Sequence, residues 1–371
     1  MRREPGGGIN ERSLSWIGYG KIEERYGIPA EALISFAANV SPLGVSERYL
    51  EGIKEKLRCV ERYPERDYKR LREALAAYCG ADAGHIIAGS GSSEIISAVI
   101  KHRSAPKVLI VAPAYAEYER NVLIAGGSVS YYRLKEEDGF EFDAAGLAGA
   151  LSEDTDILML CNPLNPTGTA IRADELETVI KRCAGLDIIC VVDETYIDFA
   201  DREYDATLLT DKYPGLFVIR SMSKFFCAPG LRLGYGITSD AQLLREIEEN
   251  KDPWSVSSLS EEAAILMLSD KEYIESARAY MEEERSRVCG RLDELKETGI
   301  SYIRPRANFV LVHLPEDGPS AKELFLMALK DNMMIRDCSD YAGLEKGYIR
   351  FCFMKKEDDD RLLSLIREAY A

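Results

Sequence analysis

A lysine, Lys224, lies in a turn-forming segment whose residue types indicate a binding loop rather than a solvated surface. Ser221 and Ser223 come just before it, Gly230 follows it, and Arg232 comes eight residues after the lysine. The apolar run before this segment predicts a buried strand that ends where the loop begins. A nucleophilic lysine needs such surroundings, whereas a solvated surface lysine does not. We therefore predict that Lys224 takes part in covalent chemistry.

Three more polar side chains follow predicted buried strands in the same way: Asn165, Asp193 and Tyr196. Ligands of open α/β sheets bind at the carboxyl ends of the strands, so these side chains and Lys224 should converge on one edge of a sheet. Pyridoxal 5'-phosphate needs this set of groups: a lysine for the Schiff base, an acid that keeps the ring nitrogen protonated, and polar groups beside the phenolic oxygen. We predict Lys224, Asp193 and Tyr196 as catalytic residues. Asp193 is assigned to the ring nitrogen, and Asn165 and Tyr196 to the ring oxygen.

An anion site for the phosphate of this cofactor is predicted where a glycine-rich segment opens a helix. A helix N-terminus with small residues exposes backbone N–H groups, and the helix dipole favours negative charge there. Side chains of the lysine loop can complete the site. The residues predicted to bind the phosphate are Ser90, Gly91, Ser92, Ser221, Ser223 and Arg232.

The elements that position these residues alternate between helical and strand patterns from about residue 67 to 237. Such alternation predicts an α/β fold with a mostly parallel central sheet covered by helices. The predicted strands are 107–112, 128–134, 156–161, 188–193, 216–220 and 231–237, and the helices between them include 67–75, with Asp67 near its N-cap, 92–101 and 174–183.

After residue 238 the pattern changes to that of a smaller α+β domain. Helices are predicted at 241–250, 261–268, 270–298, 320–330 and from 356 onward, and strands at 307–314 and 347–353. We predict a large cofactor-binding domain over 46–250, and a second unit that combines the N-terminal arm, 1–45, with a small domain over 251–371.

Composition excludes several other classes of function. The formal net charge of −16 disfavours nucleic acid, because phosphate binding depends on clustered Lys and Arg. No secretory signal and no apolar run long enough to span a membrane is found, so we expect no membrane partner and a cytoplasmic location. The nine cysteines, without any C-x-x-C pair, favour reduced thiols. The three histidines are widely separated, so no metal site is expected.

Taken together, the motifs resemble those of fold-type I pyridoxal-phosphate enzymes of the aspartate aminotransferase superfamily. The likeness runs from about Asn39 to Arg350, and its motifs are N-P-T-G from Asn165, D-x-x-Y from Asp193, S-x-S-K ending at Lys224, and Arg232. The resemblance implies the three-layer transferase fold and a homodimer with shared active sites. It also implies that Tyr115 stacks on the cofactor ring and that Tyr63 reaches the phosphate of the neighbouring subunit's cofactor.

Two branches of the superfamily fit these motifs: histidinol-phosphate aminotransferases and threonine-phosphate decarboxylases. Residues 36–44 and 253–256, the latter reading P-W-S-V, resemble decarboxylase signatures. The resemblance implies a small phospho-amino acid as substrate, either threonine phosphate or serine phosphate, and decarboxylation as the reaction; transamination of histidinol phosphate is the alternative. The residues expected to bind the substrate are Asn39, Asn165, Arg336 and Arg350.

Two arginines suit such a substrate, because the guanidinium group binds carboxylate and phosphate alike. Which bond at the substrate Cα breaks depends on the bond held perpendicular to the cofactor ring, so the pose on Arg336 and Arg350 decides the reaction. The decarboxylase branch also has a histidine before a glycine near its N-terminus, whereas residues 5–10 of this chain, P-G-G-G-I-N, contain none. The substrate therefore stays open at this stage.

Three other interpretations fit single motifs less well. A dinucleotide fingerprint from Gly89 and Gly91 would need a third glycine where Glu94 stands. The S-x-x-K from Ser221 matches serine acyltransferases, but their companion motifs are absent from the sequence. A binding protein without a cofactor would have no need for Lys224.

Overall fold

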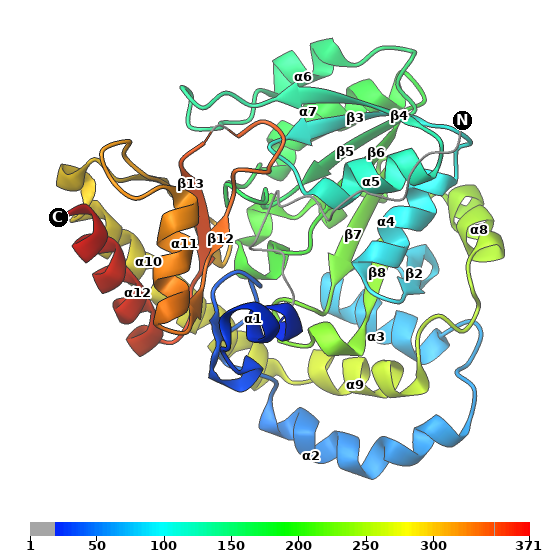
Figure 1. The fold of residues 1–371 in the computed structure, drawn as a ribbon. Helices are drawn as coiled ribbons and strands as arrows, with labels where there is room; N and C mark the ends of the chain where they lie inside the picture. Colours follow the sequence, from blue (N-terminus) through cyan, green and yellow to red (C-terminus); the bar gives the residue numbers. More distant parts are fainter. Residues whose placement is uncertain (1–18, 345) are drawn as a thin grey trace, which may run out of the picture.

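The structure is a computed structural model that describes residues 19–344 and 346–371; the glycine-rich residues 5–10 lie outside this range. Its largest element is a seven-stranded sheet in the order β2-β8-β7-β6-β5-β3-β4 (Figure 1). The strands are β2 (Ile86–Gly89), β3 (Lys107–Ala112), β4 (Ser128–Arg133), β5 (Ile157–Cys161), β6 (Ile189–Asp193), β7 (Leu216–Ser221) and β8 (Gly234–Ile237).

Helices cover both faces of this sheet, which confirms the predicted three-layer α/β fold. Because successive side chains of a strand point to opposite faces, Ile189 and Val191 of β6 pack in one apolar core while Cys190 and Val192 pack in the other. The first core includes α4 (Ser92–Lys101), α5 (Ala116–Ile124) and α8 (Ala241–Asn250). The second includes α3 (Lys69–Cys79), α6 (Ala144–Ala150) and α7 (Ala173–Ala184).

The direction of strand β8 differs from what a wholly parallel pattern predicts. β8 pairs antiparallel with β7 and with β2, whereas β3 to β7 pair in parallel. Parallel neighbours need a crossover connection, usually a helix, and the segment between β7 and β8 is instead the lysine loop. The strand predicted over 231–237 also begins later, because Arg232 adopts a left-handed backbone conformation with φ 54°.

A second sheet lies beside the first and carries the two predicted substrate arginines. Its strands pair antiparallel in the order β12-β13-β10-β9. They are β9 (Ser301–Ile303), β10 (Phe309–His313), β12 (Arg336–Asp337) and β13 (Tyr348–Cys352). The helices that accompany it, seen beside this sheet in Figure 1, are α10 (Lys271–Asp293), α11 (Ala321–Lys330) and α12 (Lys356–Tyr370).

The N-terminal arm joins this smaller unit through a short parallel pair, β1 (Ile34–Ser35) with β11 (Met333–Met334). This pairing favours grouping 1–45 with 251–371, which stays a prediction. Helix α9 (Ser258–Leu268), although beyond residue 250, packs against α2 (Glu47–Lys56) and α3. The described part of the arm also contains helix α1 (Tyr19–Tyr26).

Two predicted helix ends were wrong. Helix α3 begins at Lys69 rather than at residue 67, because its N-cap, Tyr68, has a left-handed backbone (φ 45°), and it ends before Gly80, which takes φ 77°. The long helix predicted to reach residue 298 ends at Asp293, because a 3₁₀ turn, Lys296–Thr298, follows and Gly299 takes φ 84°. Propensity alone places such ends poorly because the last turns contribute few hydrogen bonds.

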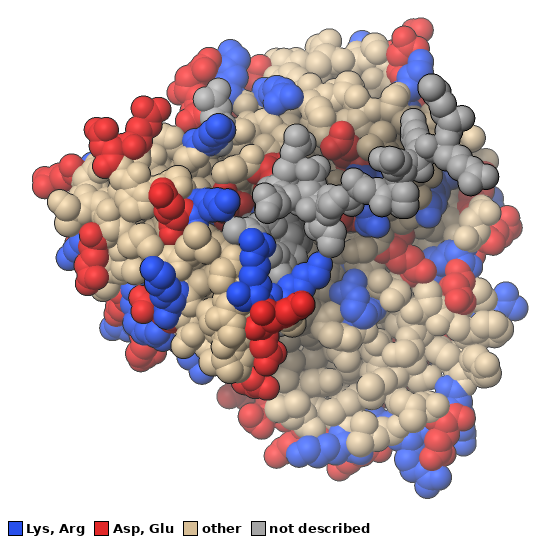
Figure 2. All heavy atoms as spheres, viewed as in Figure 1, with Lys and Arg blue, Asp and Glu red and all other residues tan. Residues whose placement is uncertain are grey.

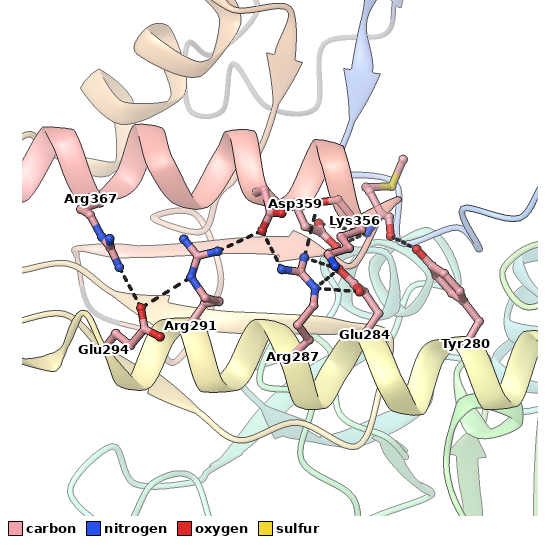
Figure 3. Close-up of polar contacts among 10 residues, drawn as sticks. Tyr280, Glu284, Arg287, Arg291, Glu294, Lys356, Asp359 and Arg367 are labelled. Atoms are coloured by element: carbon pink, nitrogen blue, oxygen red, sulfur yellow. Dashed lines mark hydrogen bonds and ion pairs between the residues drawn. The ribbon is translucent and has the colours of Figure 1, made fainter.

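A polar cluster joins α10 to α12 (Figure 3). Arg287 lies against the carboxylate of Glu284, with Nε 3.0 and 2.9 Å from its two oxygens, and its Nη1 donates to Asp360 at 2.6 Å. Asp359 is fully buried beside Glu284, and both of its oxygens lie 3.0 Å from the backbone nitrogen of Met354. Burial, followed by the hydrogen bond with Glu284, raises the pKa of Asp359 to about 9.

We expect Asp359 to make the stability of the protein fall with rising pH. The folded protein keeps a proton on Asp359 that the unfolded chain releases above about pH 4, so its stabilising contribution is complete below pH 4 and is lost as the pH approaches about 9. The Asp359→Asn variant cannot ionise and keeps an acceptor for Met354. Its free energy of unfolding, measured with denaturant at pH 5 and pH 9, should therefore fall less than that of the wild type. Asp360→Asn is the control and should keep the wild-type slope; equal slopes for all three proteins would contradict this role of Asp359.

The face drawn in Figure 2 shows Lys and Arg side chains interspersed with Asp and Glu rather than gathered in one basic patch. Across residues 19–344 and 346–371, no helix is both long and apolar enough to cross a membrane. Within the same residues, no group of three or more His, Cys, Asp and Glu side chains is placed to hold a metal ion.

Candidate active site

Lys224 lies in the loop after β7, at the carboxyl edge of the large sheet, with its ammonium nitrogen pointing to the N-terminal arm. Nζ donates a hydrogen bond to the carbonyl oxygen of Ala38 at 2.7 Å. Burial, and then the positive charges of Arg350 and Arg232, lower the pKa of Lys224 to about 8. A substantial fraction of this amine is therefore neutral, and hence nucleophilic, near physiological pH.

Asp193 is the last residue of β6 and its carboxylate is buried beside the lysine loop. Oδ1 accepts from the backbone nitrogen of Thr195 at 3.0 Å and from its hydroxyl at 2.6 Å, and Oδ2 accepts from the Tyr118 hydroxyl at 2.7 Å. Burial raises the pKa of Asp193, while these donors act in the opposite direction. A carboxylate that is desolvated but rigidly held is suited to pair with a protonated ring nitrogen.

Thr195 and Tyr118 were not predicted from the sequence. Thr195 could have been, because a threonine two residues after an aspartate commonly bonds back to it at the start of a turn. Tyr118 gave no such signal, since it comes from α5, far away in the chain, and only the folded sheet brings it to Asp193.

Asn165, Tyr196 and Asn39 each make polar side-chain contacts in the structure, and a further tyrosine, Tyr341, joins Asn165. Asn39 has a left-handed backbone, φ 53°, and its amide donates to the Tyr196 hydroxyl at 3.4 Å. The side-chain oxygen Oδ1 of Asn165 accepts a hydrogen bond from the hydroxyl of Tyr341 at 3.3 Å and another from the guanidinium group of Arg350. The Oδ1 atom of Asn39 is buried without a hydrogen-bond partner among the described residues, which leaves an acceptor facing this cluster.

The residues predicted to bind an anion meet where the start of α4 lies against the end of the lysine loop. Gly91 has φ 79°, and a Cβ there would lie 2.3 Å from Nη2 of Arg232, so the guanidinium group sits directly over this glycine. A Cβ on Gly234 would lie 2.3 Å from the backbone nitrogen of Ser92. Helix α4 has no side-chain cap. Glycine is thus required at two points where a cation and the backbone at the start of α4 approach closely.

The other predicted phosphate residues border the same place. Ser223 donates its backbone N–H to the hydroxyl of Ser221 at 3.2 Å. The backbone nitrogen of Ser90 donates to the carboxylate of Glu94 at 2.6 Å, so Ser90 is already occupied by an acidic side chain. The backbone N–H of Gly91 is also engaged, by the carbonyl oxygen of Gly89 at 2.8 Å.

A buried ionic network fixes the residues next to Asp193 and Ser221. Arg220 lies 2.8 Å from Glu194 and 2.6 Å from Asp205, and all three side chains are largely buried. Breaking one partner of such a network leaves an uncompensated buried charge. The network therefore holds the ends of β6 and β7 in one relative position.

The two predicted substrate arginines are direct partners across the small sheet, because Arg336 of β12 faces Arg350 of β13 in the antiparallel register. Residues in that relation point to the same face. Arg350 donates to Asn165, to the Tyr341 hydroxyl at 3.1 Å and to the Ala37 carbonyl at 2.7 Å. Both guanidinium groups are almost fully buried.

The two tyrosines predicted only from resemblance lie in different places. Tyr115 precedes α5, its ring packs edge-on against Tyr118 at 5.7 Å, and burial raises its pKa to about 12. Tyr63 lies apart from this cluster, because it is 83% exposed and its ring packs 5.3 Å from that of Trp254.

A strand-end lysine, a buried aspartate beside it and a helix that opens with glycine are the features expected of a fold-type I pyridoxal-phosphate enzyme. The model of the family "Aminotransferase class I and II" matches residues 31–366, and the chain belongs to this family. A threonine-phosphate decarboxylase of Salmonella typhimurium is 33% identical over 341 residues, which cover 92% of each chain.

Two solved structures are also similar. The histidinol-phosphate aminotransferase from Clostridium acetobutylicum is 31% identical, has a TM-score of 0.85, and the match covers 91% of this chain and 98% of that one. The L-threonine-O-3-phosphate decarboxylase from Porphyromonas gingivalis is 24% identical, has a TM-score of 0.79, and the match covers 91% and 99%. The predicted fold and family are thereby confirmed.

Proposed function

We propose that this enzyme binds pyridoxal 5'-phosphate and decarboxylates L-threonine O-3-phosphate or a close phospho-amino acid such as serine phosphate. The observation that carries the proposal is the pair of buried arginines, Arg336 and Arg350, facing one way from β12 and β13 beside Asn165. A phospho-amino acid carries two anionic groups, and two guanidinium groups bind them in a fixed geometry. The name of the Salmonella typhimurium relative supports decarboxylation as the reaction.

The residues present fit the cofactor. The cradle at Gly91 and Arg232 accepts its phosphate, Asp193 takes the ring nitrogen, Tyr115 lies where a ring can stack, and Asn165 and Tyr196 supply polar groups for the ring oxygen. When bound, the cofactor supplies an electron sink for the electron pair left on the substrate Cα when a bond there breaks.

The side chains of this protein then have separate tasks. Arg350 and Arg336 would bind the substrate phosphate, which leaves the carboxylate at Cα free to depart as CO₂. The bonding pair would stay at Cα, and the ammonium group of Lys224 would deliver one proton there, which completes the aminoalkyl phosphate. Asp193 would keep the ring nitrogen protonated, because its carboxylate is buried and fixed by its donors.

A second candidate, transamination of histidinol phosphate or a similar amino acid, is favoured by one contact. Arg350 donates to Asn165, the residue assigned to the ring oxygen, so a carboxylate bound to Arg350 would lie near the ring plane. The Cα proton would then face Lys224, which would remove it rather than deliver one. The name of the Clostridium acetobutylicum structure is consistent with this alternative.

One assay separates the two reactions. The purified holoenzyme is incubated with threonine phosphate, with serine phosphate, and with histidinol phosphate plus 2-oxoglutarate, and both CO₂ and glutamate are measured. We expect CO₂ from a phospho-amino acid without any keto acid. Glutamate without CO₂ would overturn decarboxylation and establish the aminotransferase.

We also propose that the chain works as a homodimer. Leu57, Val60, Tyr63 and Trp254 are exposed large apolar or aromatic side chains, and an exposed cluster of this kind commonly marks a protein interface. Within its own chain, Tyr63 lies apart from the active-site cluster. In a dimer, it could reach the active site of the partner subunit. The holoenzyme should sediment as two chains, and Tyr63→Glu should shift it toward one; a wild-type monomer would refute the proposal.

A further inference from the structure

Arg336 differs from Arg350 in what it binds within the chain. Its Nη2 donates to both carboxylate oxygens of Asp340, at 2.6 and 2.9 Å. The hydrogen-bond partners of Arg350 among the described residues are instead an amide oxygen, a hydroxyl and a backbone carbonyl, all of which are neutral. One of the two arginines therefore has its charge neutralised by a carboxylate of the protein, and the other does not.

Asp340 lies on the more accessible side of this ion pair. The side chain of Arg336 is 3% exposed, whereas that of Asp340 is 24% exposed. An anion that approaches Arg336 from solvent consequently meets the negative charge of Asp340 close to the guanidinium group. Like charges at this range repel, and the partly buried position weakens screening by salt.

The loop that carries Asp340 is part of the active site. The next residue, Tyr341, lies with its ring 5.1 Å from the guanidinium carbon of Arg336, and its hydroxyl contacts both Asn165 and Arg350. Two residues further on, a Cβ on Gly343 would lie 3.2 Å from Ala112 at the end of β3. Asp340 is thus held between the small sheet and the carboxyl edge of the large one.

We propose that Asp340 is a specificity-determining residue that occupies Arg336 as a resident counter-ion and excludes anions held through their phosphate alone. Inorganic phosphate and simple phosphate esters have only the contacts of that phosphate with the two arginines to offset the repulsion. A phospho-amino acid is also held through its amino group, so it displaces the carboxylate. This inference rests on the proposed function for the identity of the substrate's distal group.

The test uses ethyl phosphate, which carries the phosphate ester but has no amino group and so undergoes no reaction. Isothermal titration of the holoenzyme measures its affinity in the wild type, in Asp340→Asn and in Asp317→Asn, an exposed acid in the loop before α11 that controls for net charge. Loss of the resident charge should tighten binding by about tenfold in Asp340→Asn. Asp317→Asn should match the wild type.

A double variant shows whether the gain passes through Arg336. Combining Asp340→Asn with Arg336→Gln removes both charges of the pair together, which leaves no uncompensated buried charge and should abolish the gain. Asp340→Ser must reproduce the gain of Asp340→Asn, so the result does not depend on the folding of one variant. Unchanged or weaker binding in both single variants, or a gain that persists without Arg336, would overturn the inference.

The titration is independent of turnover. If affinity rises as expected but no phospho-amino acid releases CO₂, the proposed reaction fails and the role of Asp340 stands. If CO₂ is released but ethyl phosphate binds equally well to wild type and variants, the reaction stands and the role of Asp340 is refuted.

Discussion

Replacing Lys224 with alanine should yield a folded protein that no longer attaches pyridoxal phosphate covalently and that loses turnover by more than about 10³-fold, since a nucleophile and a proton-transfer group are removed together. The measurement is reduction of the holoenzyme with borohydride, followed by mass spectrometry of its peptides. In the wild type the added pyridoxyl mass should fall on Lys224.

Lys251 provides a matched control, because its side chain is also largely buried and burial lowers its pKa as well. In Lys251→Ala the label should remain on Lys224. A label found on any other lysine of the wild type, or retained in Lys224→Ala, would refute the assignment.

The same labelling should depend on pH in a way that identifies the amine. The pKa of Lys224 is lowered to about 8, so the neutral fraction rises steeply between about pH 7 and 9. The rate at which the apoenzyme attaches the cofactor should rise over that range, whereas an ordinary lysine would need a pH above 10.

Replacing Asp193 with alanine should leave the cofactor attached but lower kcat by about 10²–10⁴-fold, because nothing then holds a proton at the ring nitrogen. Asp193→Asn should be similarly impaired, since the amide preserves the volume and an acceptor for Thr195 but not the charge. The two variants thereby separate electrostatics from packing. Steady-state assays with the preferred substrate give kcat, and near-wild-type activity in Asp193→Asn would remove Asp193 from the mechanism.

The matched control for Asp193 is Tyr118→Phe, which removes one hydrogen bond to the carboxylate and keeps the ring in the core. A single neutral donor contributes less than the charge itself, so the loss of kcat should be clearly smaller than in Asp193→Asn. A loss as large as that of Asp193→Asn would show that orientation of the carboxylate, rather than its charge, limits the reaction.

The residues of the site that could be predicted are those that follow strands. Asn165, Asp193 and Lys224 each come directly after a buried apolar run, and the rule that parallel strands end at one edge brings them together. The anion site at Gly91 could be predicted for a similar reason, since glycine before a helix is a local signal.

The contacts that could not be predicted depend on pairings between distant parts of the chain. Tyr118 reaches Asp193 from the helix after a different strand, and Tyr341 reaches Asn165 from the small sheet. The arginines were predicted to bind one substrate, but their direct opposition depends on the register of β12 and β13, which no local pattern fixes. Arg336 was predicted to bind the substrate. The sequence did not indicate that the carboxylate of Asp340 binds the same guanidinium group and so competes with the substrate for it.

Two consecutive peptide groups of the N-terminal arm have an unusual position between the two sheets. The carbonyl of Ala37 accepts from Arg350 of the small sheet, and the carbonyl of Ala38 accepts from Lys224 of the large one. Each of these backbone carbonyls therefore binds a cationic side chain of a different sheet. A substrate and cofactor that take over these cations exchange partners rather than create contacts from nothing, and both exchanges act on the same stretch of arm. One short stretch of arm backbone is thereby bonded to both sheets at once, so a shift of either cation would alter a hydrogen bond of that same stretch.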